Sequence, residues 1–214
     1  VSDGFRATQP GQRPKPKSGR VATEWVEPYE EFRERLNVLV ANAAQCDAGS
    51  LDCSESCFAR SEHLRMDEHK GFGGCLYCAF RRVSTPYVLV LQHDRPAIRS
   101  FDAASVLAAM EASPEQVKYV GLPTKSSLAR TGDSHLASCW HIQTEVVKVA
   151  ADSDATLRPL LFWYDSAHIC NLDHYVNFVF KKGRIHCGGF PEDSLGQEMQ
   201  ADIRAAAAEG RWKE

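Results

Sequence analysis

The sequence predicts a single α/β domain of three layers, with a mostly parallel sheet between helices. Three observations lead to this fold class. The chain has 214 residues, which suits one such domain with a real core. Short apolar runs alternate with amphipathic helical segments along the chain. The run YVLVL (87–91) is continuously apolar, as expected for an interior strand of a parallel sheet that is buried on both faces.

Composition narrows the class of protein further. The hydrophobic share of 43% and the charged share of 25% are ordinary for a globular protein, and no stretch approaches the roughly 20 apolar residues of a membrane span. A net charge of -3 with intermixed signs argues against a general nucleic-acid-binding surface. We expect a soluble protein, intracellular or organellar, whose eight cysteines are mostly free thiols.

The elements follow in order after a basic arm. Residues 1–20 form a Pro-rich loop or arm that cannot bury an apolar face, and the α/β domain spans 21–214. Apolar residues recur at spacings of three and four over 27–44, which predicts an amphipathic helix. The glycine-rich KGFGG (70–74) predicts a turn into a second helix over about 74–83, followed by the strand 87–91.

The second half continues the alternation. Asp102 is expected to cap a short helix, and VKYVGL (117–122) to form the next strand, so that the three elements make a parallel βαβ unit. A long loop covers about 123–140. We then expect a short strand at 144–150, a strand at 160–170, a helix over 171–180, and a last helix over 194–210 that Ser194 opens in a capping box.

Polar groups at the end of the run 87–91 suggest a binding site. Gln92, His93 and Asp94 follow the strand directly, and ligands of open parallel sheets bind at the carboxyl ends of the strands. A carboxylate there can hold a divalent cation, which can neutralise a diphosphate. The alternative is that Asp94 only ends the strand and pairs with Arg95 or Arg99.

The segment that leads into this strand end resembles a known family. The run KGFGGCLYCAFRRVSTPYVLVLQHD is similar to glycosyltransferases of the GT-A fold, a Rossmann-like α/β fold, and above all to the large family-two group. In that family a glycine-containing turn and a helix of small residues lead into a strand that ends in an Asp-x-Asp-like motif. Val1-Ser2-Asp3-Gly4 resembles the end of the second sheet strand, and GGFPEDSLGQ (188–197) resembles the Glu-Asp motif on the acceptor side.

The resemblance implies roles for specific residues. Asp193, with Glu192 beside it, would be the catalytic base of an inverting transfer. The donor, a nucleoside-diphosphate sugar, would contact Asp3 at its base and the strand end at its diphosphate, with Mn²⁺ or Mg²⁺ on Asp94. We expect the substrate to contact the segment before the acceptor motif. These expected contacts are Asp3, Gln92, His93 and Asp94 for the donor, and Trp163, Asp165 and His168 for the substrate.

Two departures from the family pattern matter. Gln92 replaces the first acidic residue of the motif, which removes one negative charge from the expected cation site. If Asp3 ends the second strand, the first strand is absent, and a protein partner or an upstream segment is expected to cover the incomplete sheet edge.

Some of these residues also have purely structural explanations. Asp193 precedes a predicted helix and can stabilise its N-terminus without any chemistry. Cys53, Cys57, Cys75 and Cys78 have spacings loosely like a zinc site, but small residues that pack under a sheet explain the last two equally well.

Two functions therefore compete. The first is an active nucleotide-sugar transferase with an unknown acceptor, and the second is a non-catalytic GT-A-like domain that serves as a subunit of a larger, possibly organellar, assembly. A docking role makes no demand on Asp94 or Asp193, whereas catalysis does.

Overall fold

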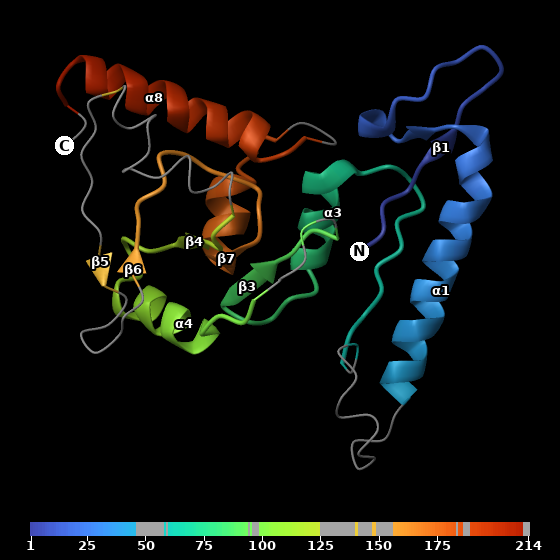
Figure 1. The fold of residues 1–214 in the computed structure, drawn as a ribbon, viewed down its shortest axis with the longest axis horizontal. Coiled ribbons are helices and arrows are strands. Elements are labelled where there is room, and N and C mark those ends of the chain that lie inside the picture. Colours follow the sequence, from blue (N-terminus) through green and yellow to red (C-terminus); the bar gives the residue numbers. More distant parts are fainter. Residues whose placement is uncertain are drawn as a thin grey trace. The chain divides into compact units, whose positions relative to one another are not determined.

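The computed structural model describes residues 1–45, 58, 60–93, 95, 99–124, 140, 147–148, 156–182, 184–185 and 189–211. These residues form two compact units. The first comprises Val1–Arg82 with Cys187–Gly189, and the second comprises Val83–His186 with Phe190–Glu214. The chain is a mixed α/β protein (Figure 1). In the described part of the chain, no helix combines the length and apolar character that a membrane crossing requires.

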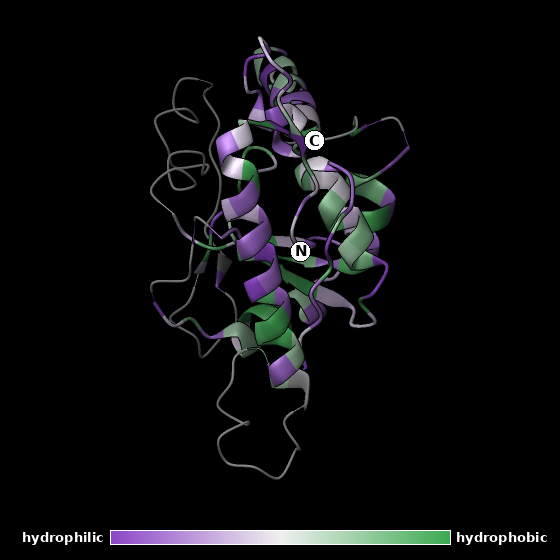
Figure 2. Ribbon diagram, turned by 90° about the vertical axis from the view of Figure 1, so that its right-hand side faces the viewer, coloured by the Kyte–Doolittle hydropathy of each residue, from purple (hydrophilic) through white to green (hydrophobic). Residues whose placement is uncertain are grey.

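The helices of the first unit match the prediction closely. Helix α1 (Val26–Gln45) occupies the predicted amphipathic segment, and it carries both hydrophilic and hydrophobic residues (Figure 2). Helix α3 (Gly71–Phe80) begins three residues before the predicted start. The glycine-rich stretch is therefore the first turn of the helix, because Gly71, with a φ of 68°, begins it.

The basic arm is paired within the first unit. Strands β1 (Arg6–Ala7) and β2 (Arg20–Val21) are parallel neighbours, with a short 3-10 helix at Pro16–Ser18 between them. Another 3-10 helix, Thr23–Trp25, leads into α1. At Gly19, which closes the arm with a φ of 71°, an added Cβ would lie 2.3 Å from the ring of His69. The composition of the arm thus does not prevent order, because its backbone pairs with its own far end.

The second unit is built on a three-stranded sheet. Strand β7 (His168–Asn171) lies in the middle, antiparallel to β3 (Tyr87–Val90) on one side and to β4 (Tyr119–Gly121) on the other. Strands β3 and β4 therefore run in the same direction, joined through α4 (Ala103–Ala112), with β7 between them. Strands β5 (Val147–Lys148) and β6 (Thr156–Leu157) form a separate antiparallel pair.

This arrangement corrects the predicted place of the run 87–91. Among the described residues, β3 pairs with β7 alone and antiparallel to it, so the prediction of an interior strand in a mostly parallel sheet is wrong for this ladder. Val88 and Val90 are buried, while Leu89 between them is 48% exposed. A short apolar strand at a sheet edge has the same composition as an interior strand. The composition of the run therefore could not show whether the strand lies at the edge or in the interior.

The core packs on both faces of this sheet. Met110 of α4 packs against Val120 and Ile169 on one face. On the other face Tyr175, at the start of a π-helical turn (Tyr175–Val179) that follows α7 (Leu172–His174), contacts the ring of His168. Asp102 caps α4 as predicted, with its carboxylate accepting from the Ser105 amide at 3.1 Å.

Two predicted boundaries near the C-terminal part are wrong. The strand expected over 160–170 begins only at His168, because residues 161–167 form a buried irregular segment. Their apolar composition indicated burial but not strand pairing. The last helix begins as a π-helical turn at Glu192–Gly196 and continues as α8 (Gln197–Ala208). Ser194 lies inside that turn and donates to the carbonyls of Phe190 and Pro191, so it is not the N-cap.

Candidate functional site

The carboxyl ends of β3 and β4 meet at the start of β7. Val90 and Gly121 both pair with His168, so the buried segment that precedes β7 lies at this end of the sheet. Gln92 is half-buried and His93 is exposed directly after β3. The predicted ligand Asp94 lies outside the described residues.

A cationic side chain also lies at this end. The Arg95 amide donates to the Gln92 carbonyl at 3.0 Å, which closes a turn after β3. Its guanidinium donates to the hydroxyl oxygens of Tyr164 (3.2 Å) and Ser166 (3.4 Å). The turn after β3 is thus tied to the segment before β7 through a positive group. From the sequence, Arg95 was expected only as a possible salt-bridge partner of Asp94.

The segment before β7 is joined to the acceptor-side motif by a reciprocal pair of hydrogen bonds. The Glu192 amide donates to Asp165 Oδ2 at 2.8 Å, and the Asp165 amide donates to Glu192 Oε2 at 3.3 Å. The indole Nε1 of Trp163 donates to the other carboxylate oxygen, Asp165 Oδ1, at 2.8 Å. We call this arrangement of Trp163, Asp165 and Glu192 the Asp165 clasp.

The clasp holds its carboxyl group in an unusual environment. Asp165 is 3% exposed, and burial raises its pKa to about 7. The hydrogen bonds from Glu192 and Trp163 oppose this rise, while the negative charges of Glu192 and Asp193 add to it. Asp165 therefore changes charge near neutral pH.

Aromatic rings pack behind the clasp. His168 is fully buried among the rings of Tyr119, Trp163 and Tyr175, whose centroids lie 4.8 to 5.6 Å from its own. Its Nδ1 lies 2.5 Å from the Ser166 carbonyl and, since a carbonyl only accepts, carries the proton. Burial lowers the pKa of His168 to about 4, so the ring is neutral at pH 7.

Several predicted site residues thus lie at one end of the sheet. They are Gln92, Trp163, Asp165, His168, Glu192 and Asp193. Trp163, Asp165 and His168 are at most 4% exposed, so here they support the acceptor-side turn from behind. Asp193 is exposed in the first turn of its helix. Tyr119 was not predicted to take part, although its place in the run 117–122 marked it as a strand residue.

Asp3 lies in the other unit and has a different role there. Its Oδ1 accepts from the amides of Gly4 (2.9 Å) and Lys70 (2.7 Å), and its Oδ2 from the Gly71 amide (2.9 Å) and His69 Nδ1 (2.7 Å). Asp3 therefore caps α3, and both of its oxygens are engaged by the protein itself. In the segment expected to end the second sheet strand, Ser2 forms an isolated parallel bridge with Arg65, outside the named strands.

The metal ligands expected from the sequence lie only partly within the described ranges. No group of three His, Cys, Asp or Glu side chains within them is placed to hold a metal ion. Cys75 and Cys78 are free thiols, and burial raises the pKa of Cys75 to about 12. Their expected zinc partners, Cys53 and Cys57, lie outside the described residues, as does Asp94.

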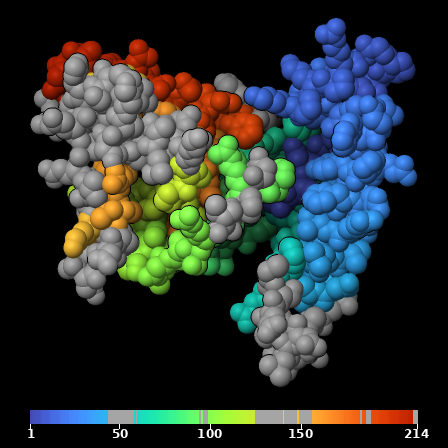
Figure 3. Space-filling model, viewed as in Figure 1, coloured from blue at the N-terminus to red at the C-terminus, as the bar shows by residue number. Residues whose placement is uncertain are grey.

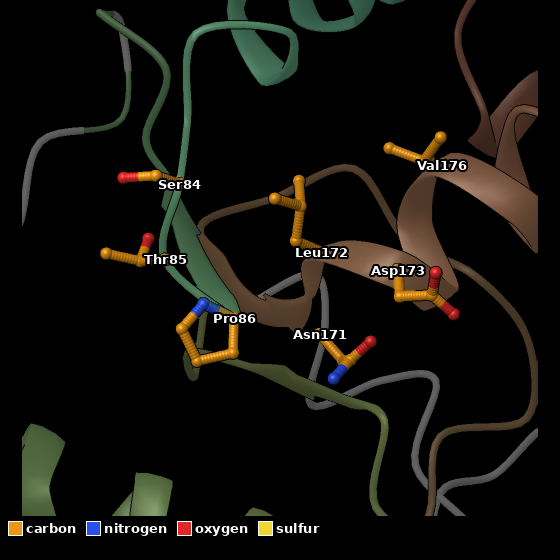
Figure 4. Close-up of a pocket in the computed structure, with 7 residues that line it drawn as sticks. All are labelled: Ser84, Thr85, Pro86, Asn171, Leu172, Asp173 and Val176. Carbon is orange, nitrogen blue, oxygen red and sulfur yellow. The ribbon is translucent and has the colours of Figure 1, made fainter.

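A surface pocket lies at the opposite end of the sheet (Figure 4). It has a volume of about 460 Å³ and is lined by Ser84, Thr85, Pro86, Asn171, Leu172, Asp173 and Val176. Its polar groups largely serve the local backbone: Thr85 donates to the Tyr87 carbonyl, and Asn171 accepts from the His174 amide. Because it joins the start of β3 to the end of β7, this pocket is separate from the clasp.

No protein-family model, curated protein or solved structure matches this chain. The function is therefore inferred from the site itself.

Proposed function

We propose that the protein is an inverting glycosyltransferase of the GT-A kind, which transfers a sugar from a nucleoside diphosphate to a hydroxyl acceptor. The observation that carries this proposal is the Asp165 clasp. It joins the turn that bears Glu192 and Asp193 to the end of the sheet where Gln92 lies. Donor-side and acceptor-side groups must lie at one end of the sheet if a sugar is to sit between them.

The side chains suit the two halves of such a reaction. Asp193 is exposed and can take the proton from the acceptor hydroxyl while the acceptor oxygen bonds to the anomeric carbon. The bond from that carbon to the diphosphate breaks, and its electron pair leaves with the diphosphate. Arg95, together with Mn²⁺ or Mg²⁺ on Asp94, would stabilise the departing negative charge.

A non-catalytic GT-A-like subunit of a larger assembly is the second candidate. Two observations favour it: Gln92 is neutral where the family motif is acidic, and both oxygens of Asp3 are used to cap α3. In that role a protein partner would cover the edge of β3, where Leu89 is 48% exposed.

Nucleotide binding tests the proposal without knowledge of the acceptor. Calorimetry with UDP, GDP and CDP should show binding that Mn²⁺ strengthens by about tenfold, equivalent to about 1.4 kcal/mol. Asp94→Asn should remove the effect of Mn²⁺. Asp102→Asn is the matched control, because Asn caps helices as well as Asp and the site is untouched. If none of the three nucleotides binds, with or without Mn²⁺, the non-catalytic candidate is the better one.

A further inference from the structure

The Asp165 clasp needs a side chain at position 165 that accepts two hydrogen bonds, and few side chains can do so. One carboxyl oxygen accepts from an indole N–H and the other from a backbone N–H, each at 2.8 Å, in a position that is 3% exposed. Both contacts need an acceptor. An amide in place of the carboxyl would set its NH₂ group against one of these donors, and an apolar side chain would leave two buried donors unpaired.

We propose that Asp165 is a positioning residue, which fixes the Glu192–Gly196 turn, and with it the general base Asp193, against the carboxyl end of the sheet. This inference rests on the proposed function and extends it by assigning the group that sets the base in place.

The packing of the Glu192–Gly196 turn shows how the clasp can fix the position of Asp193. Gly196 lies so close to the segment before β7 that an added Cβ would be 2.7 Å from the Trp163 carbonyl. Leu195 beside it is 1% exposed. The turn is thus pressed on the segment at its end and hydrogen-bonded to Asp165 at its beginning. Asp193 lies between these two points, so a loss of the clasp would release the part of the turn that carries it.

The charge of Asp165 bears on this role. In the part of the chain that the structure describes, the titratable groups that interact with it are Glu192 and Asp193 from the turn, Tyr119 from β4, and Tyr175 from the segment after β7. All of these are acidic or neutral. Burial raises the pKa of Asp165 to about 7, so the clasp passes between its neutral and charged forms near physiological pH. The charged form is the better acceptor for both N–H groups.

The test is an NMR titration of the full chain between pH 5 and pH 9. The Glu192 amide and the Trp163 indole N–H should shift together, with one midpoint near pH 7. Asp165→Asn should abolish both shifts, and Trp163→Phe identifies the indole signal. Asp173→Asn is the matched control, because that exposed carboxylate accepts from Asn177 outside the clasp and its loss should change neither titration. Titration of neither signal in the wild type, or of both unchanged in Asp165→Asn, would overturn the assignment. The wild-type titration decides even if the variant does not fold.

A kinetic measurement separates positioning from packing. With the donor found by calorimetry, Asp165→Asn should lower kcat at least tenfold while the KM for donor stays within about twofold. The wild-type kcat should also rise through the same pH midpoint. Equal kcat values for wild type and variant would refute the positioning role. Absence of transfer by the wild type would instead refute the proposed function, and the NMR titration alone would then decide whether Asp165 holds the turn.

Discussion

Two aspartates in this protein do the same structural work in opposite surroundings. Asp3 in the first unit accepts backbone amides at the start of α3, and Asp165 in the second unit accepts one at the start of the turn that leads into α8. Asp3 receives four donors, one of them His69, and its side chain is 27% exposed. Asp165 receives two donors, is 3% exposed, and lies beside Glu192 and Asp193.

The comparison shows that capping a helix does not by itself fix the charge of a carboxylate. Water, the number of N–H donors and the sign of neighbouring charges decide the balance. At Asp165 the loss of water outweighs two good hydrogen bonds, and its pKa rises to about 7. Asp3 connects the N-terminus to α3, and Asp165 connects the segment before β7 to the Glu192–Gly196 turn through a carboxyl group that changes charge near neutral pH.

The largest expected effect is therefore a pH dependence that belongs to Asp165. Between its ordinary pKa of 3.8 and its folded value of about 7, the folded chain holds a proton that the unfolded chain has released. Stability is thus lost as pH rises through this window, by up to about 4 kcal/mol at 1.36 kcal/mol per pKa unit. The measurement is urea unfolding from pH 4 to 8. Relative to Asp165→Asn, the wild type should become less stable across the window, and parallel curves would contradict this account.

The Asp3 connection should give the next largest effect. Asp3→Ala leaves the amides of Lys70 and Gly71 without their acceptor and removes the carboxylate partner of His69 Nδ1. We expect a loss of about 3 kcal/mol, since hydrogen bonds to charged groups contribute about 1.5 to 3 kcal/mol each. Native-state hydrogen exchange at the amides of α3 would measure it. A loss below about 1 kcal/mol, within the range of an ordinary cap, would show that the remaining contacts of Val1–Gly4 suffice.

The smallest effect should come from an exposed cap. Asp102 caps α4 with the Ser105 amide and hydroxyl as donors, and it lies in water. Asp102→Ala should lower the protection of the α4 amides against hydrogen exchange, as the loss of an N-cap does, but by less than Asp3→Ala lowers the protection of the α3 amides. Asp102→Ser should restore most of it. If Asp102→Ala costs as much as Asp3→Ala, the ranking by number of donors fails.

Much of the local structure could be predicted because local signals determine it. The spacing of apolar residues located α1, and Asp102 located the start of α4. Within the second unit, Met110 of α4 packs against the sheet, and α8 forms part of the surface of the unit, as the space-filling view shows (Figure 3). Segments with a strong period or a good cap are predictable for this reason.

Long-range pairing could not be predicted from the same signals. The βαβ order correctly indicated that β3 and β4 share a direction, but nothing near either strand indicates that β7 lies between them. At the site, the Glu-Asp motif and the segment before β7 were both singled out from the sequence. Their union through Asp165 depends on contacts between residues 27 positions apart, and the pKa of Asp165 rises mainly because the folded chain buries it.

The central place of β7 has a consequence for the order of folding. Strands β3 and β4 are complete once residue 121 is made, but the strand that pairs with both begins at residue 168. During synthesis, therefore, the backbone edges of these two strands stay unpaired, and Val88, Val90 and Val120 stay exposed, until β7 is made. Such exposure favours aggregation. Closure of this sheet is a late, non-local event, and such pairings are slow because distant segments lose entropy when they come together, before any contact between them compensates the loss. The nascent chain depends on β7 to protect two strands that were made well before it.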